Sequence, residues 1–94
     1  MIRPVTTGEL CLLARVLVPA PEQDRPGLAA GILAETQIAA EYLDRHGRPH
    51  PQLGDGSIAA RCLRLFPPSE SFCDPQFLRA LQLACAALVR HLET

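Results

Sequence analysis

The chain has 94 residues, of which 48% are hydrophobic and 20% are charged, and this size and balance predict one small globular domain spanning 1–94. The net charge is −1, because nine arginines stand against ten acidic residues and lysine is absent, so no overall positive field favours nucleic acid or an anionic membrane. The sequence contains no uncharged apolar run of about 18 residues and therefore predicts no transmembrane helix.

The first predicted helix spans about 7–18 and begins with a capping box. The Thr6 hydroxyl is expected to accept a backbone N–H three residues on, and the Glu9 carboxylate is expected to reach back to the cap. Apolar residues recur at helical spacing and also fill most of the remaining positions, so that Arg15 is the one charged residue after Glu9. A helix this apolar is either central to the core or shared with a partner. Pro19 ends it.

The second predicted helix spans 26–46 and has a proline at its first position, where the missing N–H costs nothing. Apolar residues from Leu28 to Leu43 recur on one of its faces. Gly47 is typical of the left-handed residue that follows a helix, and Pro49 prevents continuation.

A short third helix is predicted over 57–66, with Asp55 or Ser57 as its N-cap. Its apolar residues lie at helical spacing, so one face should point into the core. We expect the inward residues to be Ile58, Cys62, Leu65 and Phe66.

The last predicted helix spans 75–93, where Asp74 suits the N-cap and Pro75 the first position. A stripe at helical spacing is flanked by further apolar residues, and the opposite face is mostly polar. The stripe consists of Phe77, Leu81, Ala84, Leu88 and Leu92, and Leu78, Cys85 and Val89 flank it. Because no segment alternates as a strand does, the fold class is expected to be all-α, a compact orthogonal or up-down bundle of four helices.

The helices predicted over 7–18 and 75–93 carry more apolar surface than a core of this size has room for. Large exposed apolar patches usually mark partner sites. The sequence has no GxSxG, HExxH or paired catalytic carboxylates, so we expect no enzyme, no catalytic residues and no cofactor. The leading hypothesis is a non-catalytic interaction or assembly module that self-associates or binds another protein through these two helices.

The connector before the third helix is the most site-like segment. It is locally basic, and its glycine-rich turn leads into a helix N-terminus, where backbone N–H groups and the helix dipole favour anions. A phosphate, a carboxylate or an acidic side chain is therefore a reasonable guest, which makes an anion-binding module the second hypothesis. The candidate ligand-binding residues are Arg48, His50, Gly54, Asp55, Gly56 and Ser57.

A rigid connector explains the same residues without a guest. The Asp55 carboxylate can itself occupy the helix N-terminus as a cap, and Arg48 can pair with a neighbouring acid. A metal site is not expected, because Gly47 and Pro49 break the helix that would bring His46 and its neighbour at position 50 onto one face.

Accessory nucleic-acid binding is a third hypothesis, and it depends on four arginines around the connector. The connection between the second and third helices is too long for a helix-turn-helix, which makes nucleic acid an improbable partner. The four residues are Arg45, Arg48, Arg61 and Arg64.

The four cysteines contain no CxxC pair of the kind that zinc sites use. Cys11 and Cys85 fall on apolar helix faces and are expected to be buried and reduced, whereas Cys73 lies in a loop and is expected to be exposed.

Charged residues interrupt the first apolar run, so we expect it to belong to the mature protein and not to a signal peptide, and we expect a cytoplasmic protein.

The segments GRPHP at 47–51 and GDGSI at 54–58 form a GRPHPxxGDGS motif. With this motif the chain resembles a family of small proteins of unknown function from marine and photosynthetic alphaproteobacteria, of the Rhodobacterales type. The RPVT start at 3–6 and the Asp74-Pro75 helix start extend the resemblance over most of the chain. The resemblance implies a bacterial, cytoplasmic, single-domain protein, and it carries over no catalytic residue.

Overall fold

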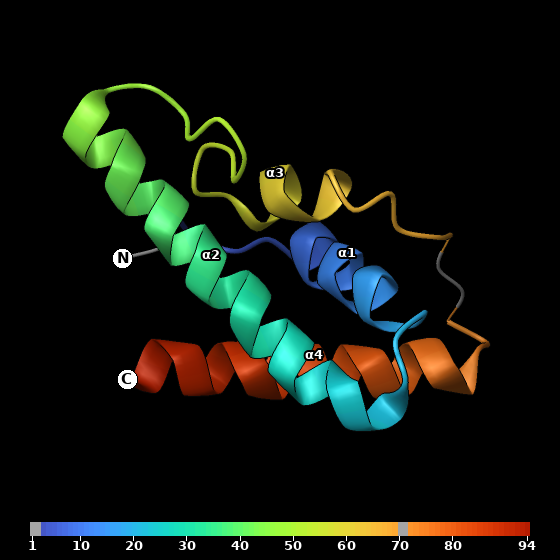
Figure 1. The fold of residues 1–94 in the computed structure, drawn as a ribbon. Helices are drawn as coiled ribbons and strands as arrows, with labels where there is room; N and C mark the ends of the chain where they lie inside the picture. Colours follow the sequence, from blue (N-terminus) through green and yellow to red (C-terminus); the bar gives the residue numbers. More distant parts are fainter. Residues whose placement is uncertain (1–2, 70–71) are drawn as a thin grey trace.

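The computed structural model describes residues 3–69 and 72–94, and in these ranges the chain folds into four α-helices and one short 3₁₀ helix, without a strand (Figure 1). The predicted all-α fold class is confirmed. The helices are α1 (Thr7–Leu17), η1 (Glu22–Asp24), α2 (Arg25–His46), α3 (Ile58–Leu63) and α4 (Pro75–Glu93).

Helix α1 lies at the centre of the fold. It packs against α3 on one side and α4 on the other, and α2 crosses in front of the layer that they form (Figure 1). Leu13, Ala14 and Leu17 are completely buried, and no large exposed hydrophobic residue of the described ranges belongs to α1. The sequence left open whether this helix is central to the core or shared with a partner, and the structure places it at the centre of the core. Its apolar surface is enclosed by the chain itself.

Both ends of α1 are capped by side chains. At its start, the Glu9 backbone N–H donates to Thr6 Oγ1 at 3.1 Å and the Thr6 N–H donates to Glu9 Oε1 at 3.2 Å, which confirms the capping box. At its end, the buried Arg25 guanidinium donates to the carbonyls of Leu17 and Val18 at 3.0 and 2.9 Å. Sequence reasoning did not identify Arg25, because the residue lies in the next helix and nothing local marks its role.

Helix α3 is shorter than predicted at its C-terminal end. It stops at Leu63, and the prediction that Leu65 and Phe66 point inward is wrong, since their side chains are 40% and 90% exposed. The cause is Pro67, whose ring disfavours helical geometry at the preceding residue. Phe66 instead adopts a left-handed φ of 51°. The other two inward residues, Ile58 and Cys62, are buried as predicted.

The cysteines divide into two buried and two exposed side chains. Cys11 and Cys62 are buried and Cys73 is exposed, as expected, but Cys85 is exposed, so its predicted burial is wrong. The other helices cover only part of the wide apolar arc of α4, and Cys85 lies on the uncovered part. Burial raises the pKa of the Cys62 thiol to about 11, so it stays protonated and unreactive at neutral pH.

Candidate functional site

The predicted anion loop closes on itself through His50. The His50 N–H donates to the Gly54 carbonyl at 2.8 Å, and the Gly54 N–H donates back at 3.1 Å. The ring turns inward as well, because Nδ1 accepts the backbone N–H groups of Gln52 and Leu53, each at 3.1 Å. Its edge packs against Tyr42, with the ring centres 4.9 Å apart. The His50 side chain therefore organises its own loop.

Two glycines let this loop lie directly on the helices. Gly54 and Gly56 are buried and have φ values of 90° and 92°, a region that other residues rarely adopt. A Cβ on Gly56 would stand 2.7 Å from the Cα of Ala40 in α2, and a Cβ on Gly54 would stand 2.7 Å from the Cβ of Ala60 in α3. Close packing explains these two glycines without a ligand.

The backbone N–H groups at the start of α3 are taken by the protein's own side chains. Ser57 Oγ accepts the Ala60 N–H at 3.1 Å, as expected of an N-cap. Asp55 Oδ1 accepts the Ser57 N–H at 3.0 Å and the Ser57 hydroxyl at 2.7 Å. Glu9 Oε2, from α1, accepts the Ala59 N–H at 2.9 Å. A guest anion at this helix end would have to displace one of these two carboxylates.

Asp55 is also held by a residue that sequence reasoning missed. Its Oδ2 accepts from Arg3 Nη1 at 3.0 Å, an ion pair between partly exposed side chains. The hydrogen bonds from Ser57, with the charge of Arg3, lower the pKa of Asp55 below its ordinary value of 3.8. Arg3 and Glu9 lie about fifty positions from their partners, so no local pattern in the sequence could have connected them.

The structure thus gathers Gly54, Asp55, Gly56 and Ser57 at the start of α3, while Arg48 lies exposed outside this cluster.

Two of the four arginines of the nucleic-acid hypothesis are engaged within the chain. Arg61 pairs with Glu35 at 3.1 Å, and Arg64 donates to a loop carbonyl. Within 3–69 and 72–94, no three His, Cys, Asp or Glu residues are placed to hold a metal ion. Anion and nucleic-acid binding here stay predictions.

A second candidate site is the outer face of α4. Phe77, Ala80 and Ala84 are buried on its inner face. Four apolar residues on the opposite flank remain in contact with solvent, and Leu78, Val89 and Leu92 are 40%, 55% and 61% exposed. A shallow hollow beside them is lined partly by Pro75 and Leu81. We call these four exposed residues the α4 stripe, namely Leu78, Cys85, Val89 and Leu92.

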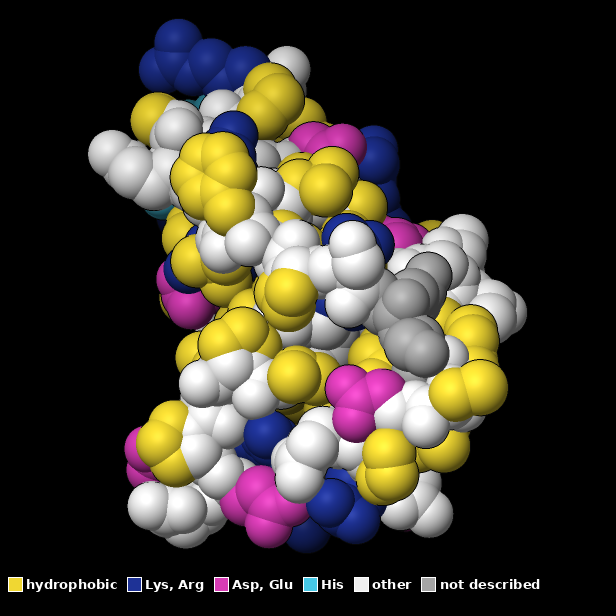
Figure 2. Space-filling model, turned by 90° about the vertical axis from the view of Figure 1, so that its right-hand side faces the viewer, with side chains coloured by type: hydrophobic (Ala, Val, Ile, Leu, Met, Phe, Trp, Pro, Cys, Tyr) yellow, Lys and Arg dark blue, Asp and Glu magenta, His cyan; other side chains and the backbone are white. Residues whose placement is uncertain are grey.

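Further apolar side chains are exposed at the end of α3 and on the connection to α4. Leu63 and Phe72 are 58% and 61% exposed, and the Phe72 ring meets Phe77 edge-on at 5.3 Å. Figure 2 views the molecule from this side and shows hydrophobic side chains dispersed among polar ones, with charged side chains together at the lower edge.

A family described as a domain of unknown function (DUF7742) matches residues 3–88. The match takes in α1, α2 and α3 in full and α4 as far as Leu88. No curated protein and no solved structure matches the chain. Among the described helices, none combines the length and the hydrophobicity that crossing a membrane requires.

Proposed function

The chain belongs to the DUF7742 family of domains of unknown function, and we propose that it is a non-catalytic assembly module that self-associates through α4. The observation that supports this is the α4 stripe, in which side chains as apolar as Val89 and Leu92 remain more than half exposed on a helix that contributes its other side to the core. Covering such a stripe removes apolar surface from water, which favours association.

A second copy of the chain is the partner that suits this stripe. Cys85 lies midway between Leu78 and Leu92, seven residues from each, so the stripe is nearly symmetric about its centre. Two antiparallel copies related by a two-fold axis at Cys85 would place Leu78 of one against Leu92 of the other. The four stripe residues carry no charge, and the arginine beside them, Arg79, has an acidic partner within the chain in Glu22.

The dimer is expected to be weak. Helix α4 has 19 residues, which makes it about 28 Å long and about 10 Å wide. One such face covers on the order of 300 Å² per copy, well below the roughly 800 Å² per partner of a standard stable interface. Association should therefore depend on concentration, as it does in transient complexes.

Cross-linking through Cys85 tests the proposal. With the two Cys85 side chains at the symmetry axis, mild oxidation or a short thiol cross-linker should produce a covalent dimer. Cys85→Ser should abolish this dimer, and Cys73→Ser, which removes the other exposed cysteine, should leave it intact. A cross-link that depends on Cys73, or none at all, contradicts an α4 interface.

Sedimentation equilibrium gives an independent measurement. Leu92→Glu should weaken dimerisation at least about tenfold, because it buries a carboxylate in an apolar contact. Leu63→Glu is the matched control, since Leu63 is similarly exposed but lies on α3, and it should leave the dimer unchanged. Circular dichroism verifies that both variants remain folded. A chain that is strictly monomeric at every concentration rules out the proposal.

A further inference from the structure

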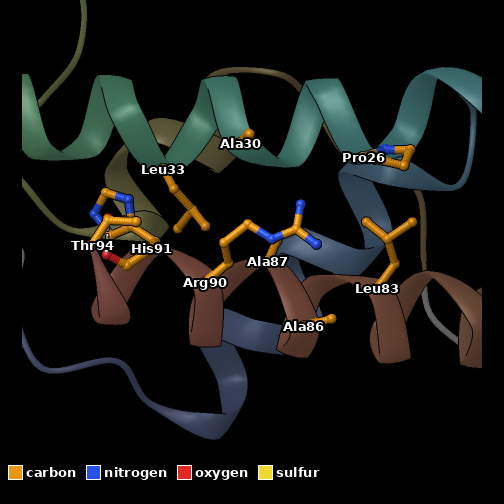
Figure 3. Close-up of a pocket in the computed structure, with 9 residues that line it drawn as sticks. All are labelled: Pro26, Ala30, Leu33, Leu83, Ala86, Ala87, Arg90, His91 and Thr94. Atoms are coloured by element: carbon orange, nitrogen blue, oxygen red, sulfur yellow. Dashed lines mark hydrogen bonds between the residues drawn. The ribbon is translucent and has the colours of Figure 1, made fainter.

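A groove of about 280 Å³ lies between α2 and the C-terminal half of α4, and no residue of the α4 stripe lines it. Its walls are mostly apolar, with Ala30 and Leu33 from α2 and Leu83 and Ala87 from α4 (Figure 3). The alanines keep the groove open, because larger side chains at their positions would fill the space between the two helices. Neither the proposed dimer nor the connector loop uses this place.

One cationic side chain, that of the exposed residue Arg90, lies over these apolar walls. Arg90 extends from α4 across the groove towards α2, between Leu33 and Leu83 (Figure 3). In the part of the chain that the structure describes, Arg90 makes no ion pair, whereas Arg3, Arg25, Arg61 and Arg79 each have an acidic partner. The groove lining contains no Asp or Glu, and His91 stands at the same end as Leu33. The charge of the groove is therefore complementary to an anion.

The volume of the groove limits what it can hold. A water molecule occupies about 30 Å³ in the liquid, so 280 Å³ corresponds to about nine groups of that size. An α-helix with its side chains is about 10–12 Å across and is too wide for such a space. The groove is at the lower end of the size range of small-molecule sites, about 300–1,000 Å³.

We propose that this groove binds a small amphipathic anion, such as a medium-chain carboxylate. Its carboxylate would pair with Arg90, and its hydrocarbon chain would lie along the accessible lining residues Ala30, Leu83 and Ala87. An arginine fork suits a carboxylate because it offers two parallel N–H donors. The apolar walls add the free energy of removing the chain from water.

Octanoate is the probe, because its ten heavy atoms match the volume of the groove. Titration followed by calorimetry and by NMR should show saturable binding that shifts the resonances of Ala30, Leu83 and Ala87. Octanamide has the same chain without the charge and should bind at least about tenfold more weakly. Acetate has the charge without the chain and should not bind measurably.

Two variants and a control locate the site. Arg90→Gln should weaken octanoate binding at least tenfold and should make octanoate and octanamide bind equally. Ala30→Leu, at an exposed helical position, should block both probes by filling the groove. Arg45→Gln removes the same charge from a distant exposed position of α2 and should have no effect.

Three results would overturn the inference. They are an absence of octanoate binding at millimolar concentration, binding that shifts residues of the 48–57 loop instead of the groove, and equal affinity for octanoate and octanamide in the unmodified chain. Unfolding curves of the variants separate loss of the site from loss of the fold.

Discussion

The 48–57 loop and the α4 stripe differ in a way that the sequence does not reveal. The loop is basic and rich in glycine, which is typical of a ligand site, yet its polar groups bond to one another and to Glu9 and Arg3. The stripe has the ordinary apolar pattern of a core helix, yet its side chains contact solvent. Unusual composition therefore does not by itself show that polar groups are open to a ligand, and an ordinary apolar pattern does not by itself show that a helix face is covered.

Substitution of a loop glycine should produce the largest effect. Gly56→Ala combines a left-handed φ, which costs about 1–2 kcal/mol for other residues, with a clash against the α2 backbone. We expect a loss of about 2–5 kcal/mol in the free energy of unfolding, measured by urea denaturation. Gly47→Ala is the control, because its φ is also positive but nothing lies within 4 Å, and it should cost only about 1–2 kcal/mol.

This result would separate a packed connector from an open loop. Equal losses for Gly56→Ala and Gly47→Ala would mean that the loop does not press against α2 in solution. The comparison with the stripe would then lose its basis, since both regions would be open surfaces.

The pH dependence of stability should show a smaller effect at Asp55. Its pKa is lowered in the folded chain below 3.8, so its contribution is present above that value and is lost as the pH falls through the folded pKa. Asp55→Asn should cost less than about 1 kcal/mol at neutral pH, because the side chain is more than a third exposed and water screens the Arg3 pair.

Unfolding of both proteins between pH 7 and pH 2 measures this contribution. The difference in stability between the unmodified chain and Asp55→Asn should shrink below pH 3.8. A difference that stays constant over this range would show that the ionised form of Asp55 contributes nothing.

Phosphate binding at the loop should produce the smallest effect. Because Asp55 and Glu9 already accept N–H groups at the start of α3, we expect inorganic phosphate to leave the amide resonances of residues 54–58 unshifted. A saturable shift that Arg48→Gln removes would instead establish the anion site and would reverse the comparison.

Local signals predicted most of the helices. The Thr6 capping box, the Gly47 stop and the Asp74 start each depend on residues within one helical turn, and all three are confirmed. The early end of α3 had a local signal as well, since Pro67 follows Phe66 directly and opposes the helical periodicity of the residues before it. The exposure of Cys85 had no such signal, because the residue pattern of a helical face is the same whether or not another helix covers it.

The amino-acid order was sufficient for the number, type and approximate limits of the helices, since caps, prolines and a 3.6-residue period act within a few residues of one another. It was not sufficient to show which apolar side of α4 remains open or which carboxylates occupy the start of α3. Those features depend on how α1, α2 and α3 pack around each other, because burial and hydrogen bonding are properties of neighbours in space. Glu9 and Ala59 are fifty positions apart, and only the packing of α1 on α3 brings them to 2.9 Å.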